Sequence, residues 1–383
     1  MIKTLHALKT ASLAQMDQWQ PLFFRLSEAT DHAGFEEVLT LPGLKVSDTL
    51  ASQLKELVRT LHPSVKFVPE ELDAAARAHL GATPPDEYGV WVHYPWSNRL
   101  VHLLDEDEFV LVRTDRNRNK ITREEQAVLA TKRIGVIGLS VGQSIALTMA
   151  MERSFGEVRL ADFDTLDLSN LNRIRSGVNN LGLPKVVNVA REIMEIDPFL
   201  KVTLYPEGIT RDNIERFCTE GGKLDILVDE CDSVDVKIFA RQTAKALGIP
   251  VVMDTSDRGM IDVERFDLEP ERPILHGLIE HLDPNDAAKA KTNEEKLPFL
   301  LAMVGYDRLS SRMKASLEEV GRSLVTWPQL SSNVVLGGAV AGEVCRRMLL
   351  GQHNTSGRWR VDIERATSSE QREDTPTEIS LVH

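Results

Sequence analysis

The chain has 383 residues, of which 42% are hydrophobic and 27% are charged, and its formal net charge is −13. This length predicts about two domains of ordinary size, and the hydrophobic fraction is sufficient for packed cores. The negative charge argues against a general nucleic-acid-binding protein, because such a protein needs a basic face to neutralise phosphates.

Cysteine content and hydropathy favour a cytoplasmic protein. The chain has three cysteines, Cys218, Cys231 and Cys345, and no C-x-x-C pair. This pattern fits a reducing compartment and gives no structural zinc site. No apolar run reaches the about 20 residues of a membrane span, and the N-terminus lacks the apolar core of a signal peptide.

Residues 1–115 are predicted to form a separate α+β module. Regularly spaced leucines predict a helix over residues 48–61, and Pro69 is at the favoured first-turn position of a second helix that ends at Gly81. Alternating residues from 88 to 94, a turn at 95–98 and returning strands over 99–104 and 108–114 predict a small antiparallel sheet. An aromatic cluster in this sheet either packs internally or lines a ligand or peptide groove; its members are Trp91, His93, Tyr94 and Trp96.

A basic segment over residues 114–119, containing Arg116 and Arg118, links this module to the rest of the chain. The next helix begins at a capping box, Thr122-x-x-Glu125. An apolar strand over 134–137, a turn of small residues over 138–142 and an alanine-rich helix over 143–151 then follow. This strand–turn–helix unit is typical of sites that bind a phosphate at a helix N-terminus.

Polar motifs follow the next two elements. A second strand, 158–161, ends at Asp162-Phe163-Asp164, where a carboxylate typically binds a ribose hydroxyl. The segment Ser169-Asn170-Leu171-Asn172-Arg173 comes next, and Pro184-Lys185 begins a helix that ends near Ile196. These motifs would place two cations, Arg173 and Lys185, beside a nucleotide site. Two such cations indicate chemistry on a triphosphate rather than the binding of a dinucleotide.

Acidic residues end another apolar strand near residues 224–228. Asp229, Glu230, Cys231 and Asp232 precede a predicted helix over 234–247. Asp232 could be the N-cap of that helix. Strands over 250–254, 263–266 and 358–362, a partly helical region over 267–329 and a glycine-rich apolar helix over 334–343 complete the order, and residues after Glu364 are predicted to be disordered.

The ordered set D-x-D, S-N-L-N-R and P-K resembles the adenylating domain shared by ThiF, MoeB and the ubiquitin-activating enzymes, over about residues 116–351. The resemblance implies an α/β, Rossmann-like fold with a mostly parallel sheet flanked by helices. The expected organisation is an α+β N-terminal module (1–115), an ATP-binding adenylation domain (116–363) and a disordered tail (364–383).

The resemblance also implies roles for single residues. Arg173 and either Arg116 or Arg118 from a partner subunit would grip the β- and γ-phosphates, although those two arginines could equally form a solvated basic turn. Lys185 would offset charge on the α-phosphate. The Asp232 carboxylate would bind Mg²⁺, a hard cation that prefers oxygen ligands, and Asp229 could share this role. The remaining nucleotide-binding residues would be Gly138, Ser140, Gly142, Asp162, Asp164 and Asn170. Relatives usually have G-x-G-G-x-G at the turn, whereas here Ser140, Val141 and Gln143 replace motif residues and Gly142 is one place off.

The function implied is an ATP-dependent adenylyltransferase that uses Mg²⁺, releases pyrophosphate and forms an acyl-adenylate. The expected acceptor is the C-terminus of a small ubiquitin-like or sulfur-carrier protein or of a peptide, and the expected assembly is a homodimer. No internal thioester is expected, because residues 234–344 contain no cysteine and the acids around Cys231 would raise its pKa. Residues 1–105 are expected to recognise the acceptor without affecting ATP binding.

Two alternatives remain open. A partner-recruiting module with a catalytically weak nucleotide site would explain the altered glycine turn. An NAD(P)-dependent oxidoreductase would also use the turn and Asp162, but it would leave Asn170, Arg173 and Lys185 without a role.

Overall fold

The computed structural model describes residues 16–290 and 292–368. Residues 369–383, most of the predicted disordered tail, lie outside the described residues. The prediction of disorder from residue 364 is wrong for its first residues, because helix α15 covers Ile363–Ala366. Asp362 caps this short helix by accepting the backbone N–H of Arg365.

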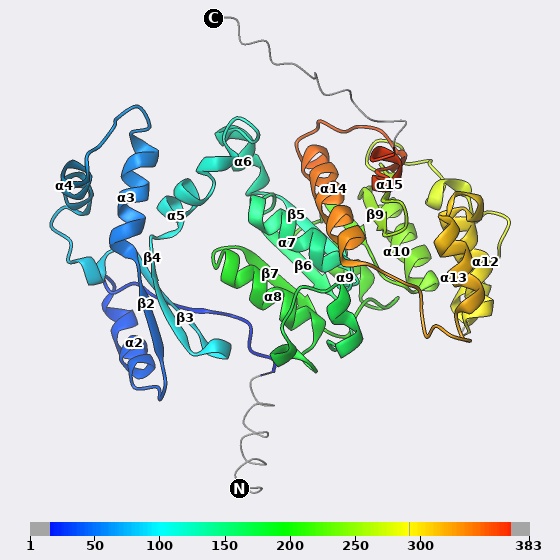
Figure 1. Cartoon of the computed structure of the whole chain (residues 1–383), viewed down its shortest axis with the longest axis horizontal. Helices are drawn as coiled ribbons and strands as arrows, with labels where there is room; N and C mark the ends of the chain where they lie inside the picture. Colours follow the sequence, from blue (N-terminus) through cyan, green and yellow to red (C-terminus); the bar gives the residue numbers. More distant parts are fainter. Residues whose placement is uncertain (1–15, 291, 369–383) are drawn as a thin grey trace, which may run out of the picture. The chain divides into compact units, whose positions relative to one another are not determined.

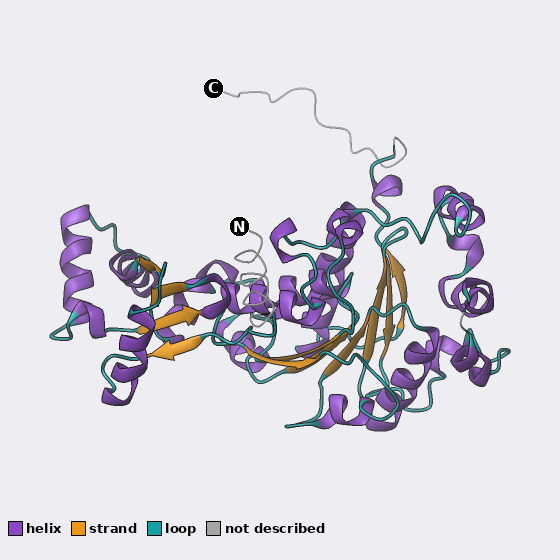
Figure 2. Ribbon diagram, turned by 90° about the horizontal axis from the view of Figure 1, so that it is seen from below, coloured by secondary structure: helices purple, strands orange, loops and turns teal. Residues whose placement is uncertain are grey.

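The strands form two sheets (Figures 1 and 2). The four-stranded sheet has the order β1-β3-β4-β2, and the seven-stranded sheet has the order β11-β10-β9-β8-β5-β6-β7. The strand bounds are β1 (Leu22–Phe24), β2 (Lys45–Asp48), β3 (Val90–Tyr94), β4 (Arg99–Leu103), β5 (Arg133–Ile137), β6 (Glu157–Ala161), β7 (Lys201–Tyr205), β8 (Ile226–Asp229), β9 (Val251–Thr255), β10 (Met260–Glu264) and β11 (Gly357–Arg360).

Pairing is parallel between β6 and β7 and between β8 and β9, and it turns antiparallel at β10 and β11. The predicted fold class is therefore confirmed: a large, mostly parallel sheet flanked by helices (Figure 2). The helices are α2 (His32–Leu39), α3 (Leu50–Leu61), α4 (Pro69–Leu80), α5 (Glu106–Arg113), α6 (Arg123–Leu129), α7 (Gly142–Glu152), α8 (Lys185–Ile196), α9 (Ile214–Thr219), α10 (Val234–Leu247), α11 (Pro284–Lys289), α12 (Asn293–Val304), α13 (Ser311–Glu319), α14 (Ser331–Leu349) and α15.

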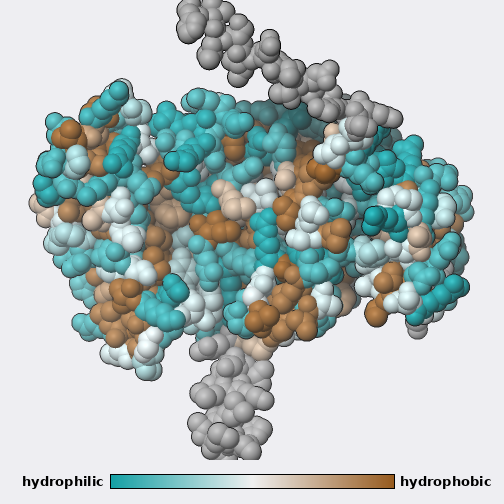
Figure 3. All heavy atoms as spheres, in the orientation of Figure 1, coloured by the Kyte–Doolittle hydropathy of each residue, from teal (hydrophilic) through white to brown (hydrophobic). Residues whose placement is uncertain are grey.

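The chain divides into two compact units. Unit 1 contains residues 1–134, 147–168 and 176–208, and unit 2 contains residues 135–146, 169–175 and 209–383. On the face drawn in Figure 3, hydrophobic residues are interspersed among hydrophilic ones. Within the described residues, no helix has the length and hydropathy needed to span a membrane.

In unit 1 the small sheet packs against α8 and the loop after it, which come much later in the sequence. Val90, Val92 and Tyr94 of β3 are buried and form a cluster that includes Phe199, from the loop after α8. The Tyr94 hydroxyl donates to the backbone carbonyl of Met194 at 3.3 Å, and the Trp96 ring N–H donates to Glu195 at 2.6 Å. Tyr94 and Trp96 therefore contribute to internal packing rather than to a groove.

This packing bears on the N-terminal module. Phe199 is also within 5.6 Å of the Phe23 ring and 5.2 Å of the Phe109 ring, measured between centroids. Removing residues 1–105 would expose Phe199 and the end of α8, the helix that begins at Lys185. We therefore expect the truncation to destabilise unit 1. These contacts argue against the expectation that residues 1–105 can be removed without affecting ATP binding.

One predicted strand of the module is wrong. Residues 108–114 were expected to form a strand, but α5 covers Glu106–Arg113. Asp105 accepts the backbone N–H of Glu106, which caps the helix, and Phe109 with its apolar neighbours packs against the core around α3. Three consecutive acids in the first turn also favour a helix through the helix dipole. The parallel partner of β4 is instead β2.

In unit 2 the predicted glycine-rich helix is part of α14. A Cβ at Gly337 would collide with the carboxylate of Asp254, and one at Gly338 would collide with Ser144. These two glycines therefore allow close packing inside the chain. Because both close approaches are internal, these glycines give no indication of a subunit interface, and the homodimer stays a prediction.

Candidate nucleotide-binding site

The turn after β5 lies directly against the end of β8. Gly138 has a φ of +84°, and a Cβ there would lie 2.6 Å from the backbone N of Cys231. Only glycine combines this φ with so close an approach. The turn and the acidic segment after β8 are therefore held together, although Ser140, Val141 and Gln143 replace residues of the glycine motif expected there.

Ser140 connects the turn to Arg173. The Nε of Arg173 donates to the Ser140 hydroxyl at 2.9 Å, and its Nη1 donates to the Asn172 side-chain oxygen at 2.9 Å. Burial lowers the pKa of Arg173, while the charge of Asp232 opposes this shift. The guanidinium stays cationic in any case, so it presents a fixed positive charge beside the turn.

Gln143 is a positioning residue that the sequence reasoning missed. Its Nε2 donates to the carbonyl of Arg175 at 2.9 Å, and its Oε1 accepts the backbone N–H of Arg175 at 2.9 Å. The side chain thus fixes the segment that carries Arg173. The sequence does show an amide side chain at the start of an apolar helix, which could have indicated this role. The residue that Gln143 binds, Arg175, is distant in the sequence, so the pairing could not be predicted.

Asn170 lies in a short 3₁₀ helix, Leu168–Asn172. Its carbonyl accepts the backbone N–H groups of Arg173 at 3.0 Å and Ile174 at 2.9 Å. Asn172 donates to the carbonyl of Gln329 at 2.8 Å. This loop therefore connects the turn to the region between α13 and α14.

Asp229 and Asp232 have different environments, which corrects one expectation. Asp229 is fully buried and forms ion pairs with Arg241 and with Lys237, the latter at 3.3 Å. Burial alone would raise the pKa of Asp229, but Lys237 and Arg241 lower it to about 2. Asp229 is therefore committed to these two cations, which argues against its sharing a metal ion, whereas Asp232 is exposed. The N-cap of α10 is Ser233, so the alternative role of Asp232 as that cap is wrong.

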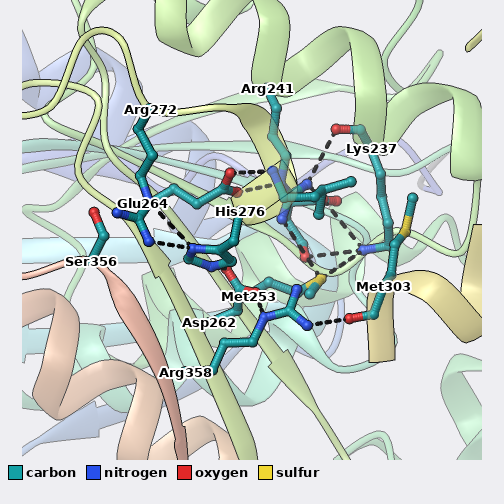
Figure 4. A network of polar contacts seen from close by, with 12 residues as sticks. Lys237, Arg241, Met253, Asp262, Glu264, Arg272, His276, Met303, Ser356 and Arg358 are labelled. Atoms are coloured by element: carbon teal, nitrogen blue, oxygen red, sulfur yellow. Dashed lines mark hydrogen bonds and ion pairs between the residues drawn. The ribbon is translucent and has the colours of Figure 1, made fainter. Parts of the chain in front are cut away.

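Below this strand end lies a buried network of charges (Figure 4). Arg241 also donates to Glu264 at 2.5 Å. On β10, Asp262 accepts from His276 at 3.0 Å and from Arg358 at 2.5 Å. Figure 4 shows Arg358 directed between Asp262 and the carbonyl of Met303, to which it also donates. The network thus ties the end of α12 to the sheet.

A second pair of acids lies beside this network. The backbone N–H of Asp254 donates to Glu230 Oε1 at 2.7 Å. Neither carboxylate oxygen of Asp254 has a hydrogen-bond partner of acceptable geometry in the part of the chain that is described. Burial raises the pKa of Asp254 to about 7, and the nearby Thr255 amide offsets only part of this. Burial, together with Asp254, also raises the pKa of Glu230 well above its usual range.

The other predicted residues belong to unit 1. Asp162 accepts the backbone N–H of Asp164 at 2.8 Å, and the carboxylate of Asp164 lies 2.7 Å from the Lys185 Nζ. Lys185 is 7% exposed, so this ion pair compensates a nearly buried ammonium. Arg116 and Arg118 are exposed, and Arg118 forms an ion pair with Asp115 at 3.0 Å.

The predicted residues thus form two groups, one in each unit. Unit 2 contains Gly138, Ser140, Gly142, Asn170, Arg173 and Asp232, and unit 1 contains Asp162, Asp164, Lys185, Arg116 and Arg118. No group of three metal-ligating side chains occurs within residues 16–290 and 292–368. Mg²⁺ often uses one or two carboxylates and completes its shell with water and phosphate oxygens, so the exposed Asp232 fits such an ion.

A cavity of about 200 Å³ lies beside Asp232 within unit 2. Acids form part of its lining, and side chains of α12, α13 and the Trp327–Gln329 segment contribute to the rest. Cys231 also contacts the cavity, and its thiol donates to Asp229 at 3.0 Å. Burial and the Asp229 charge raise the pKa of this thiol well above its usual range, as expected from its acidic neighbours.

The chain resembles proteins of several activities. It is 45% identical over 309 residues to an uncharacterized protein of Mycobacterium tuberculosis, covering 79% of this chain and 43% of that protein. It is 27% identical over 165 residues to ubiquitin-like modifier-activating enzyme 5 of Bombyx mori, covering 41% of this chain and 38% of that enzyme. The chain therefore spans less than half the length of either relative.

Among solved structures, the Escherichia coli tRNA N6-threonylcarbamoyladenosine dehydratase in complex with ATP matches with a TM-score of 0.47 and 19% identity, covering 65% of this chain and 98% of that one. The ThiF family matches residues 114–373, which is well over half of the chain. The chain therefore belongs to the ThiF family.

Proposed function

We propose that this protein is an ATP-dependent adenylyltransferase that activates the carboxylate of an acceptor and releases pyrophosphate. Membership of the ThiF family supports this reaction. The observation that carries it is the position of Arg173, which Ser140 and Gln143 fix at the turn after β5. A dinucleotide-dependent oxidoreductase could use Arg173 to neutralise its pyrophosphate, but it would leave Asn170 and Lys185 without a role.

Each residue group would contact its own part of ATP. Asp162 would accept a ribose hydroxyl, and the backbone N–H groups of the Gly138–Gly142 turn would face phosphate oxygens. Arg173 and Asn170 would contact the β- and γ-phosphates. Catalysis would then come from positioning and charge neutralisation rather than from a protein nucleophile.

Lys185 and Asp232 would act at the α-phosphate. When ATP binds, a phosphate oxygen would compete with Asp164 for the Lys185 ammonium, which then offsets the negative charge that develops during transfer. Asp232 would contribute a carboxylate to Mg²⁺, which supplies further neutralisation of the phosphates. We further propose that the protein is a homodimer in which Arg116 or Arg118 contacts the nucleotide of the partner.

The acceptor would be the C-terminus of a small carrier protein or peptide. The Bombyx mori relative is named for activating a ubiquitin-like modifier, whereas the −13 charge of this chain disfavours tRNA, the substrate named for the Escherichia coli structure. No internal thioester is proposed, because a thiol with a raised pKa is rarely in its reactive form and Cys231 has such a thiol.

Two measurements test this function. Calorimetry should show binding of ATP with Mg²⁺ and no binding of NADH. Incubation with ATP and an extract of the source cells should then give an AMP-linked product that mass spectrometry detects. Binding of NADH in preference to ATP would contradict the proposal, and ATP binding without pyrophosphate release under any condition would favour a partner-recruiting module instead.

A further inference from the structure

The lining of the cavity beside Asp232 combines two kinds of side chain. Its acids include Glu230, Asp254 and Asp257, and the rest of its lining is mainly apolar, with side chains such as Leu301, Met313 and Trp327. Because the cavity borders Asp232, a group that occupies it would lie next to the proposed metal ligand. The cavity is therefore placed to accept part of the acceptor.

The cavity is preformed. Asp257 accepts both the backbone N–H and the hydroxyl of Ser310, at 2.8 and 2.7 Å, and Ser310 caps α13. The carbonyl of Met303, near the end of α12, accepts from the half-buried Arg358 (Figure 4). Polar contacts thus hold both α12 and α13 against the sheet region. The space between the two helices is therefore a fixed feature of the fold.

Its charges exclude the acceptor carboxylate itself. The one cation at the cavity among the described lining residues, Lys237, is buried and bound to Asp229 at 3.3 Å. The remaining ionisable oxygen groups of the described lining are carboxyl groups, so a carboxylate in the cavity would have no available cation to pair with. The carboxylate must therefore stay outside, on the side of Arg173, and a neutral group must enter.

The volume indicates the size of that group. A cavity of about 150 Å³ lined by aliphatic and aromatic side chains accepts benzene, and this cavity measures about 200 Å³. One aromatic ring or one branched aliphatic side chain fits. A terminal glycine would leave the apolar walls without a contact, and each buried methylene that is missing costs about 0.8 kcal/mol.

We propose that the acceptor carries an aromatic or branched aliphatic side chain next to the carboxylate that is adenylated, and that this side chain binds between α12 and α13. This inference rests on the proposed function and narrows its acceptor class. It distinguishes a peptide or small carrier that ends in a large apolar residue from a carrier that ends in glycine.

The test uses the full-length protein and two small acids, N-acetyl-L-phenylalanine and N-acetylglycine. Calorimetry measures their affinities in the presence of Mg²⁺ and a non-hydrolysable ATP analogue. The phenylalanine derivative should bind at least about tenfold more tightly, because one large apolar group in a pocket changes affinity by that order.

Two tryptophan variants on one helix localise the effect. Met313→Trp fills the cavity and should abolish the preference for the phenylalanine derivative. Ala315→Trp adds the same side chain at an exposed position of α13 and should leave the preference unchanged. Both variants should bind the ATP analogue like the unaltered protein, which shows that they are folded.

Equal affinities for the two acids, binding of neither acid, or a preference that survives Met313→Trp would each overturn the proposal while ATP binding persists. Failure of the unaltered protein to bind the ATP analogue would contradict the proposed function, and the acceptor class with it.

Discussion

Two strand ends of the large sheet carry similar acidic motifs, yet their carboxylates have different surroundings. After β6, Asp164 faces Lys185 at 2.7 Å, and that ion pair is partly exposed. After β8, Asp229 is fully buried between Arg241 and Lys237, while Asp232, three residues on, is exposed. A buried strand residue is committed to its core partners, whereas a residue beyond the strand remains available to a ligand.

The largest effect on stability should come from replacing Asp229, the buried acid at the end of β8. In the Asp229→Asn variant, Arg241 and Lys237 lose their shared anion in a buried site, which typically costs about 3–5 kcal/mol. Urea unfolding at pH 7 would measure this change. A loss below about 1 kcal/mol would show that Asp229 does not anchor the core.

Replacing the exposed Asp232 should have the opposite result, with little change in stability and a large loss of activity. Asp232→Asn should leave the free energy of unfolding within about 0.5 kcal/mol of the unaltered protein, because the side chain is exposed. It should lower acceptor-dependent pyrophosphate release by about a hundredfold, the usual cost of one lost electrostatic contact. Unchanged release at saturating Mg²⁺ would remove the assignment of Asp232.

A third acid, Asp254, extends this comparison because its protonation should make the stability of the protein depend on pH. Because burial raises the pKa of Asp254 to about 7, the protonated side chain favours the folded state. That contribution is complete below the ordinary aspartate pKa of about 4 and is lost as the pH rises through about 7.

Asp254→Asn should therefore stabilise the protein more at pH 8 than at pH 5, by about 2.7 kcal/mol, because the proton is lost over about two pH units at 1.36 kcal/mol each. Thermal or urea unfolding of both proteins at the two values provides the measurement. A difference that is constant with pH would show that Asp254 is ionised in the folded state throughout.

The smallest effect concerns the turn after β5. Ser140→Ala removes the hydroxyl that accepts from Arg173, and a single hydrogen bond is worth about 1 kcal/mol. ATP affinity should fall by about fivefold, measured by calorimetry. Val141→Ala, next in the turn, alters packing but not this bond, and a similar loss there would point to the shape of the turn instead.

Regular elements of the large sheet were predictable because their apolar patterns are local. The bounds of β6 and α10 agree with the predicted 158–161 and 234–247 to within one residue. Residues 108–114 were misread because alternating valine and leucine also suit a helix that packs on α3, and the deciding features were the Asp105 cap and the acidic first turn.

The candidate site was predictable only where a motif is contiguous. Arg173 and Lys185 follow from short local motifs, and Arg173 does lie at the turn. The roles of Gln143 and Asp254 depend on Arg175 and Gly337, which are distant in the sequence. The burial of Asp229 likewise depends on Arg241 in the following helix, so spacing alone did not separate it from Asp232.

The most direct test of the proposed reaction is exchange of labelled pyrophosphate into ATP by the Lys185→Ala variant, measured with the acceptor present. The Lys185 ammonium is nearly buried and paired with Asp164, so Asp164→Ala serves as the control that breaks the pair but keeps the cation. The account predicts that Lys185→Ala lowers exchange by at least about a hundredfold, while ATP affinity falls far less and Asp164→Ala keeps substantial exchange. Exchange by Lys185→Ala at the rate of the unaltered protein would contradict the account.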